Sequence, residues 1–113
     1  MLFNLAFVIF NFALLNAQVV ESINVTIPGT LNIVASSYLT AVTNLTITGT
    51  IDARDFKTMR DSMTALAVLD LSGVTISAYS TYSANYIPAN AFQNKTILTS
   101  IIFPSGFLFC SGH

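Results

Sequence analysis

Three segments of this chain carry apolar residues at the same spacing, and this recurrence limits the possible folds more than any other feature. Each segment has apolar residues at the first, fourth and sixth positions of the pattern L-x-x-L-x-L. The segments begin at Val42, Leu66 and Leu98, so the pattern recurs after 24 and then after 32 residues. In a strand, successive side chains point to opposite faces. The recurrence therefore predicts a parallel sheet with one buried and one exposed face.

An apolar pattern that recurs every 24 to 32 residues is typical of a leucine-rich repeat solenoid, in which each repeat buries its apolar face against its neighbours. We therefore expect an α/β fold, namely a leucine-rich repeat solenoid fragment with a short parallel sheet, one clear helix and an N-terminal cap. The alternative is an ordinary small α/β domain whose apolar strands match by chance.

Two further segments have periodic patterns of their own. Residues 22–27 alternate between apolar and polar side chains, which predicts a short strand. Residues 30–42 favour a short helix with four apolar residues on one face. These residues are Leu31, Val34, Ala35 and Leu39. Residues 44–51 predict a strand rich in β-branched side chains, and we expect it to end at Gly49.

Most of the charge in the chain lies in one short stretch. Six of the nine Asp, Glu, Lys and Arg residues fall between Asp52 and Asp61. As a helix from Ala53 to Met63, this stretch has an apolar stripe formed by Phe56, Met59 and Met63. Asp52 is the expected N-cap, and Asp55 stands where a capping box places its second acidic residue. These charges are therefore interpreted as caps and solvent-facing groups of one helix rather than as a binding or catalytic cluster.

Two longer stretches carry a resemblance to a known family. They are "NLTITGTIDARDFKTMRDSMTALAVLDLSGVTI" (residues 44–76) and "IPANAFQNKTILTSIIFPSG" (residues 87–106). Both resemble the BspA-like leucine-rich repeat proteins, which are secreted and surface proteins of Bacteroides-type bacteria. The resemblance implies adhesion to host proteins or another interaction at the cell surface. Family members usually continue through many more repeats, and residues 107–113 do not resemble a further one, so the chain is expected to be a truncated N-terminal portion.

The first 17 residues are apolar except for three asparagines, and they end in a small residue, Ala17. Such a segment is typical of a secretory signal peptide, and the alternative is an uncleaved membrane anchor. We expect a signal peptide at residues 1–17, a cap region at 18–43, a leucine-rich repeat segment at 44–106 and an atypical tail at 107–113. The protein would then be secreted or at the cell surface, with no stable membrane span after cleavage.

The chain has few residues suited to catalysis or metal binding. The only Cys and the only His are Cys110 and His113, and their spacing resembles half of a metal site without a second pair of ligands. Asp70 is the only acid within a predicted strand, whereas glycoside hydrolysis needs two carboxylates. A net charge of −1 gives no basic patch for nucleic acid. We therefore expect no enzymatic activity, no cofactor, no metal and no nucleic-acid partner.

The expected role of such a chain is protein binding or adhesion, with host or cell-surface proteins, glycoproteins among them, as partners. The first candidate surface is the exposed face of the sheet. Its candidate residues are Asn44, Thr46, Val68, Asp70, Ser100 and Ile102. The second candidate is an interface loop with three tyrosines, Tyr79, Tyr82 and Tyr86. The alternatives are a non-functional remnant of a longer repeat protein and a fragment of a carbohydrate-active or inhibitor protein.

Overall fold

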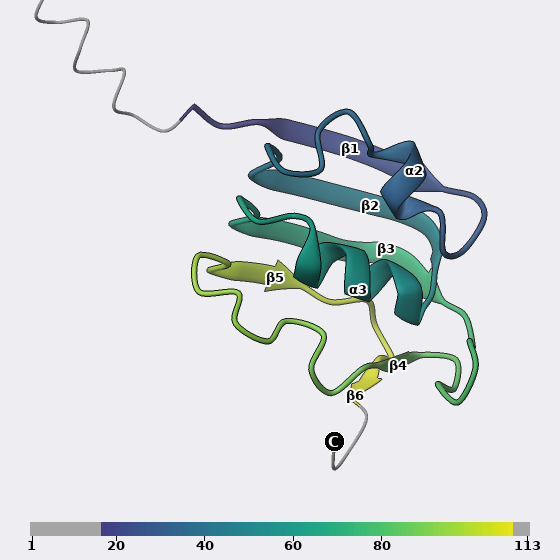
Figure 1. Ribbon diagram of the computed structural model, residues 1–113. Helices are drawn as coiled ribbons and strands as arrows, with labels where there is room; N and C mark the ends of the chain where they lie inside the picture. The colour runs from purple at the N-terminus through teal and green to yellow at the C-terminus, as the bar shows by residue number, and fades with distance from the viewer. Residues whose placement is uncertain (1–16, 110–113) are drawn as a thin grey trace, which may run out of the picture.

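The structure, a computed structural model, describes residues 17–109 and has a four-stranded parallel sheet at its centre (Figure 1). The strands are β1 (Val20–Val25), β2 (Asn44–Ile51), β3 (Val68–Ile76) and β5 (Ser100–Ile102), and they lie in the order β1-β2-β3-β5. Helices α2 (Leu31–Val34) and α3 (Ala53–Asp61) lie on one side of this sheet. Two short strands, β4 (Tyr86–Ile87) and β6 (Leu108–Phe109), form a second parallel pair. The predicted α/β class with a short parallel sheet is confirmed.

Each strand of the large sheet lies beside the strand that precedes it, and the register repeats. Val20 is opposite Asn44, Asn44 is opposite Val68, and Val68 is opposite Ser100. The entry into each of the last three strands is also the same, because two consecutive backbone N–H groups donate to one carbonyl of the preceding segment. The three acceptors are the carbonyls of Val19, Thr43 and Ala67. The chain therefore enters β2, β3 and β5 through the same hydrogen-bond arrangement.

The residues of the recurring pattern line the buried face of the sheet, as the sequence predicts. Leu45 lies opposite Leu69, which lies opposite Ile101. The pattern residues of the first two segments are at most 2% exposed, whereas those of the third segment are half-buried. The core residues are therefore most deeply buried beneath β2 and β3, and their burial decreases towards β5.

Helix α3 covers this core with the apolar stripe predicted for it, since Phe56, Met59 and Met63 are all buried. The capping box at Asp52 and Asp55 is confirmed. The predicted end at Met63 is wrong, because the helix ends at Asp61. Beyond it the carbonyl of Met63 accepts hydrogen bonds from Nζ of Lys95 and from the Leu66 backbone N–H. These bonds hold Met63 outside the helical pattern while its side chain remains in the core.

The Asp55 carboxylate also joins α3 to the turn before α2. It accepts backbone N–H bonds from Gly29 (2.7 Å), Leu31 (3.0 Å) and its own N-cap residue, Asp52 (3.0 Å). Gly29 has φ +88°, and a Cβ there would lie 2.4 Å from the Arg54 guanidinium carbon. Only glycine fits this position without displacing Arg54.

Two other predicted details are wrong. Strand β2 does not end at Gly49 but continues to Ile51, which pairs with Ile76. Gly49 has φ +95°, and the strand stays paired with β3 through this residue and beyond it. Helix α2 is a single turn, and Val34 is exposed rather than buried with Leu31. The single turn is too short to align a full apolar stripe, and the chain continues in turns.

Candidate functional site

The six residues predicted for the exposed sheet face form two straight rows across three neighbouring strands. The first row is Asn44, Val68 and Ser100, and the second row is Thr46, Asp70 and Ile102. Strand β1 extends the rows with Val20 and Ser22. All eight side chains are exposed or half-exposed. With strands about 4.8 Å apart, each row spans about 14 Å.

This set of rows, called here the sheet face, lies on the side of the sheet opposite the helices. Its side chains are short and polar except for the aliphatic groups of Val20, Val68 and Ile102, which are 67%, 36% and 52% exposed. A flat surface of small polar groups with a few exposed aliphatic ones suits contact with another macromolecule better than enclosure of a small molecule.

Asp70 is the only charged residue in the two rows. Its Oδ1 accepts hydrogen bonds from the backbone N–H of Ser72 (2.9 Å) and from the Ser72 hydroxyl (2.7 Å). These two bonds, the hydroxyl bond first, hold the pKa of Asp70 below its usual value. The carboxylate therefore stays charged at neutral pH, and among the described residues its Oδ2 accepts no hydrogen bond.

A broad hollow adjoins the first row at the amino-terminal ends of the strands. It has a volume of about 810 Å³, and Asn44 and Val68 form its boundary with the sheet face. Ala65, Ala67 and Ile97 supply apolar lining, and Thr43 and Gln18 supply polar groups. The hollow enlarges the surface on which a ligand of the sheet face would rest.

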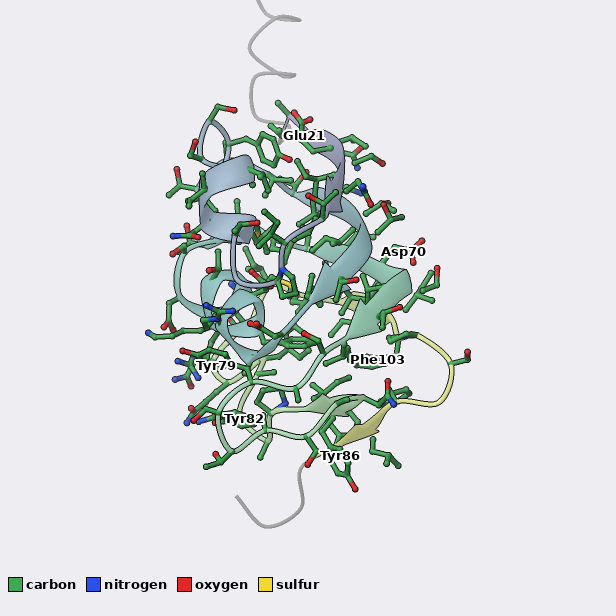
Figure 2. The ribbon with its side chains drawn as sticks, turned by 90° about the vertical axis from the view of Figure 1, so that its right-hand side faces the viewer. Glu21, Asp70, Tyr79, Tyr82, Tyr86 and Phe103 are labelled. Carbon is green, nitrogen blue, oxygen red and sulfur yellow. The ribbon has the colours of Figure 1, made fainter. Side chains whose placement is uncertain are left out.

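The three predicted loop tyrosines do not form one surface. Tyr79 and Tyr82 are 40% and 37% exposed and exchange two backbone hydrogen bonds across a tight turn. The guanidinium of Arg54 lies 4.1 Å from the centre of the Tyr79 ring. Tyr86 belongs to β4 and is half-buried opposite Leu108. Figure 2 shows Tyr79 and Tyr82 on one side of the molecule, Asp70 on the other and Tyr86 at the lower end.

The structure also reveals a pocket that the sequence reasoning missed. Tyr79 and Tyr82 line it together with Arg54, Lys57 and Arg60 of α3. The spacing of three residues between the cations could have indicated that they share one side of the helix. No local pattern, however, could show that the loop of residues 77–85 folds back against them.

The remaining sequence predictions concern residues that lie outside the described range, or they concern a membrane span, a metal ion or enzymatic activity. Residues 1–16 of the expected signal peptide, Cys110 and His113 lie outside the described residues. Within residues 17–109 no helix is long and apolar enough to cross a membrane. The same residues contain no cluster of three or more His, Cys, Asp or Glu side chains suited to a metal ion. The absence of enzymatic activity stays a prediction.

Neither a scan against protein-family models nor a search of curated proteins found a match to this chain.

Proposed function

We propose that this chain is a leucine-rich repeat binding module, related to the BspA-like surface proteins, that holds a protein ligand against its sheet face. The observation that carries the proposal is the alignment of all six candidate residues in two exposed rows across β2, β3 and β5. A repeating unit places equivalent side chains side by side, and such arrays form the extended binding surfaces of solenoid proteins.

The repeated register supports the solenoid part of the proposal. Three successive strand entries use the same hydrogen-bond pair, on the carbonyls of Val19, Thr43 and Ala67. The four strands lie side by side in the order in which they occur along the chain. A doubly wound α/β sheet reverses its strand order at a switch point, where its ligands bind, and the order β1-β2-β3-β5 contains no such reversal.

Export to the cell surface is the second part of the proposal. It is based on the apolar segment of residues 1–17 and on the family resemblance. A surface protein that adheres to host or cell-surface proteins, including glycoproteins, would use the polar rows for specificity and the exposed Val68 and Ile102 for apolar contact.

The test is binding of the full chain to an immobilised panel of host matrix proteins and mucin glycoproteins. Thr46→Arg and Ser100→Arg place a long cation on the sheet face and should abolish any binding found. The control is Thr64→Arg, because Thr64 is exposed and lies outside the two rows. A flat response of the unmodified protein across the panel, or equal losses in all three variants, would contradict the proposal.

A further inference from the structure

A second candidate site lies between α3 and the loops that follow β3. This pocket, called here the α3–tyrosine pocket, has a volume of about 180 Å³. It lies on the helix side of the molecule, away from the sheet face, as the positions of Tyr79, Tyr82 and Asp70 in Figure 2 show. Its function is therefore separable from binding at the sheet face.

The inner wall of the pocket is apolar. It is formed by Phe56, which is 1% exposed, together with Pro88 and Ala91, which are also buried. A pocket of this volume accommodates one side chain of moderate size rather than a folded surface. Burial of an apolar side chain against such a wall is favourable, because it removes apolar surface from water.

The rim of the pocket is cationic. Arg54, Lys57 and Arg60 all line it, and they are three of the four Lys and Arg residues in the chain. None of the ten residues that line the pocket carries a carboxylate. The pocket therefore presents positive groups to a ligand, whereas the acids paired with these cations, Asp52 and Asp61, do not line it.

These two acids accept hydrogen bonds from the three cations but leave some of the arginine N–H donors unbonded. Asp52, which is 1% exposed, binds Nε and Nη2 of Arg54, and Asp61 binds Nε and Nη2 of Arg60 and Nζ of Lys57. Among the described residues no hydrogen bond involves Nη1 of either arginine. A guanidinium has five N–H donors, so both arginines retain donors for a ligand.

The aromatic part of the rim is held in place. The Tyr79 ring stacks with the Arg54 guanidinium at 4.1 Å, and the backbone bonds between Tyr79 and Tyr82 fix the turn that carries both rings. Rigid tyrosines contribute contact area at a low cost in conformational entropy.

The hydrogen-bond donors and acceptors at the rim indicate which kind of ligand fits the pocket. The three cations only donate, while Tyr79, Tyr82 and Asn90 can donate or accept. A neutral sugar fits this rim poorly, because its hydroxyls also need acceptors. A group with several acceptor oxygens fits the rim well. We infer that the α3–tyrosine pocket binds an acidic peptide segment, with one apolar side chain against Phe56 and Pro88 and its carboxylates at Lys57 and Arg60.

The inference is tested by selecting peptides from a random phage-displayed library on the full chain. Enriched sequences should place Asp or Glu beside an aromatic or large aliphatic residue. A synthetic fluorescent copy of the strongest binder is then titrated by fluorescence anisotropy, with its Asn and Gln counterpart as the matched ligand control. Replacing the acidic residues should weaken binding roughly tenfold or more, and added salt should weaken binding of the acidic peptide.

Two protein variants should change the affinity for the acidic peptide in opposite directions. Arg60→Gln should weaken binding of the acidic peptide by roughly threefold to tenfold, because one rim cation is lost. Asp61→Asn should tighten it by a similar factor, because Lys57 and Arg60 lose their competing carboxylate. A gain in affinity cannot result from misfolding, so the second variant keeps the test decisive. Thr46→Arg on the sheet face should leave this affinity unchanged.

Three outcomes would overturn the inference. One is enrichment of peptides without acidic residues, and another is weaker binding in Asp61→Asn as well as in Arg60→Gln. The third is binding of a sulfated oligosaccharide that depends on Arg60 while no acidic peptide binds, which would assign the pocket to an acidic glycan.

Discussion

At the scale of single residues, the charges of α3 have different roles although they are close in sequence. Asp55 is fully buried and accepts three backbone N–H bonds, two of them from the turn at Gly29 and Leu31. Asp61 is exposed and pairs with Lys57 and Arg60, and these neighbours hold its pKa well below the usual range. Burial and bond partners, rather than charge alone, separate a structural carboxylate from a surface one.

Replacement of Asp55 by Asn should therefore destabilise the fold strongly. The amide retains one acceptor oxygen but turns an NH2 group towards buried N–H donors, so at least one donor is left unsatisfied. We expect a loss of about 2–4 kcal/mol in the free energy of unfolding, measured by urea denaturation. Asp61→Asn is the matched control, and its effect should be much smaller because its partners are exposed. Equal effects of the two variants would contradict this role for Asp55.

The pKa of Asp70 provides a test of its hydrogen bond with the Ser72 hydroxyl. Its hydroxyl and backbone bonds from Ser72 lower its pKa in the folded state. A lowered folded pKa stabilises the protein above the unfolded pKa of about 3.9, and this contribution is lost as the pH falls through the folded value.

Ser72→Ala removes the hydroxyl bond and leaves the backbone bond, so the pKa of Asp70 should rise part of the way towards about 3.9. NMR titration of the Asp70 carboxyl carbon measures this shift directly. The pKa of Asp61, which has no contact with Ser72 among its described hydrogen bonds, should not move. An unchanged Asp70 pKa would show that the hydroxyl bond is not formed in solution.

At the scale of elements, local patterns predicted what local interactions determine. The alternation in β2 and β3, the apolar stripe of α3 and its capping box are all set by residues within a few positions of one another. The hydrogen bond from Gly29 to Asp55 spans 26 residues, and the contact of Arg54 with Tyr79 spans a comparable distance. No periodicity encodes such pairs, so the turn before α2 and the α3–tyrosine pocket could not be predicted.

The sheet face could be predicted from the sequence in part. The alternation of β2 and β3 gives the outward position of Thr46 and Asp70 from sequence alone. Their alignment in one row also requires the register, which the recurring apolar spacing supplies because Leu45 and Leu69 occupy equivalent positions. The later part of β3 departs from this register by a shift between Thr46 and Thr48 in β2, where a bulge places Gly73 opposite Thr48. The repeat pattern does not contain this shift.

Gly49 controls how closely β1 and β2 approach at their carboxyl-terminal ends. A Cβ at this position would lie 2.2 Å from the Val25 carbonyl oxygen, and its φ of +95° is strained for any other residue. Gly49→Ala should therefore lower stability by more than about 2 kcal/mol.

Gly106→Ala is the matched control for Gly49→Ala. Gly106 also has positive φ (+78°), but a Cβ at this position would have no neighbouring atom within 4 Å. The difference between the two variants in thermal denaturation measures the contact with β1 apart from backbone strain. Equal effects would mean that β1 does not approach β2 as closely as the structure describes.

At the scale of the whole molecule, burial declines along the sheet from β2 and β3 towards β5. The first two pattern segments are closed by α3 and by neighbours on both sides, whereas β5 pairs only with β3 within residues 17–109. Phe92, Phe103, Phe107 and Phe109 form a chain of aromatic contacts beyond it, with Phe109 half exposed. Stability should therefore be unevenly distributed, since regions with less burial open at lower free energy.

Leu66 and Leu98 test this gradient because they fill the same first position of the recurring pattern. Leu66 is fully buried, and Leu98 is only partly buried against the core. Leu66→Ala should cost about 2–5 kcal/mol, since it leaves a cavity among residues that cannot close around it. Leu98→Ala should cost about half as much or less, because solvent already reaches part of its side chain. Denaturant midpoints of the two variants provide the comparison, and equal losses would mean that the third segment is packed as tightly in solution as the second.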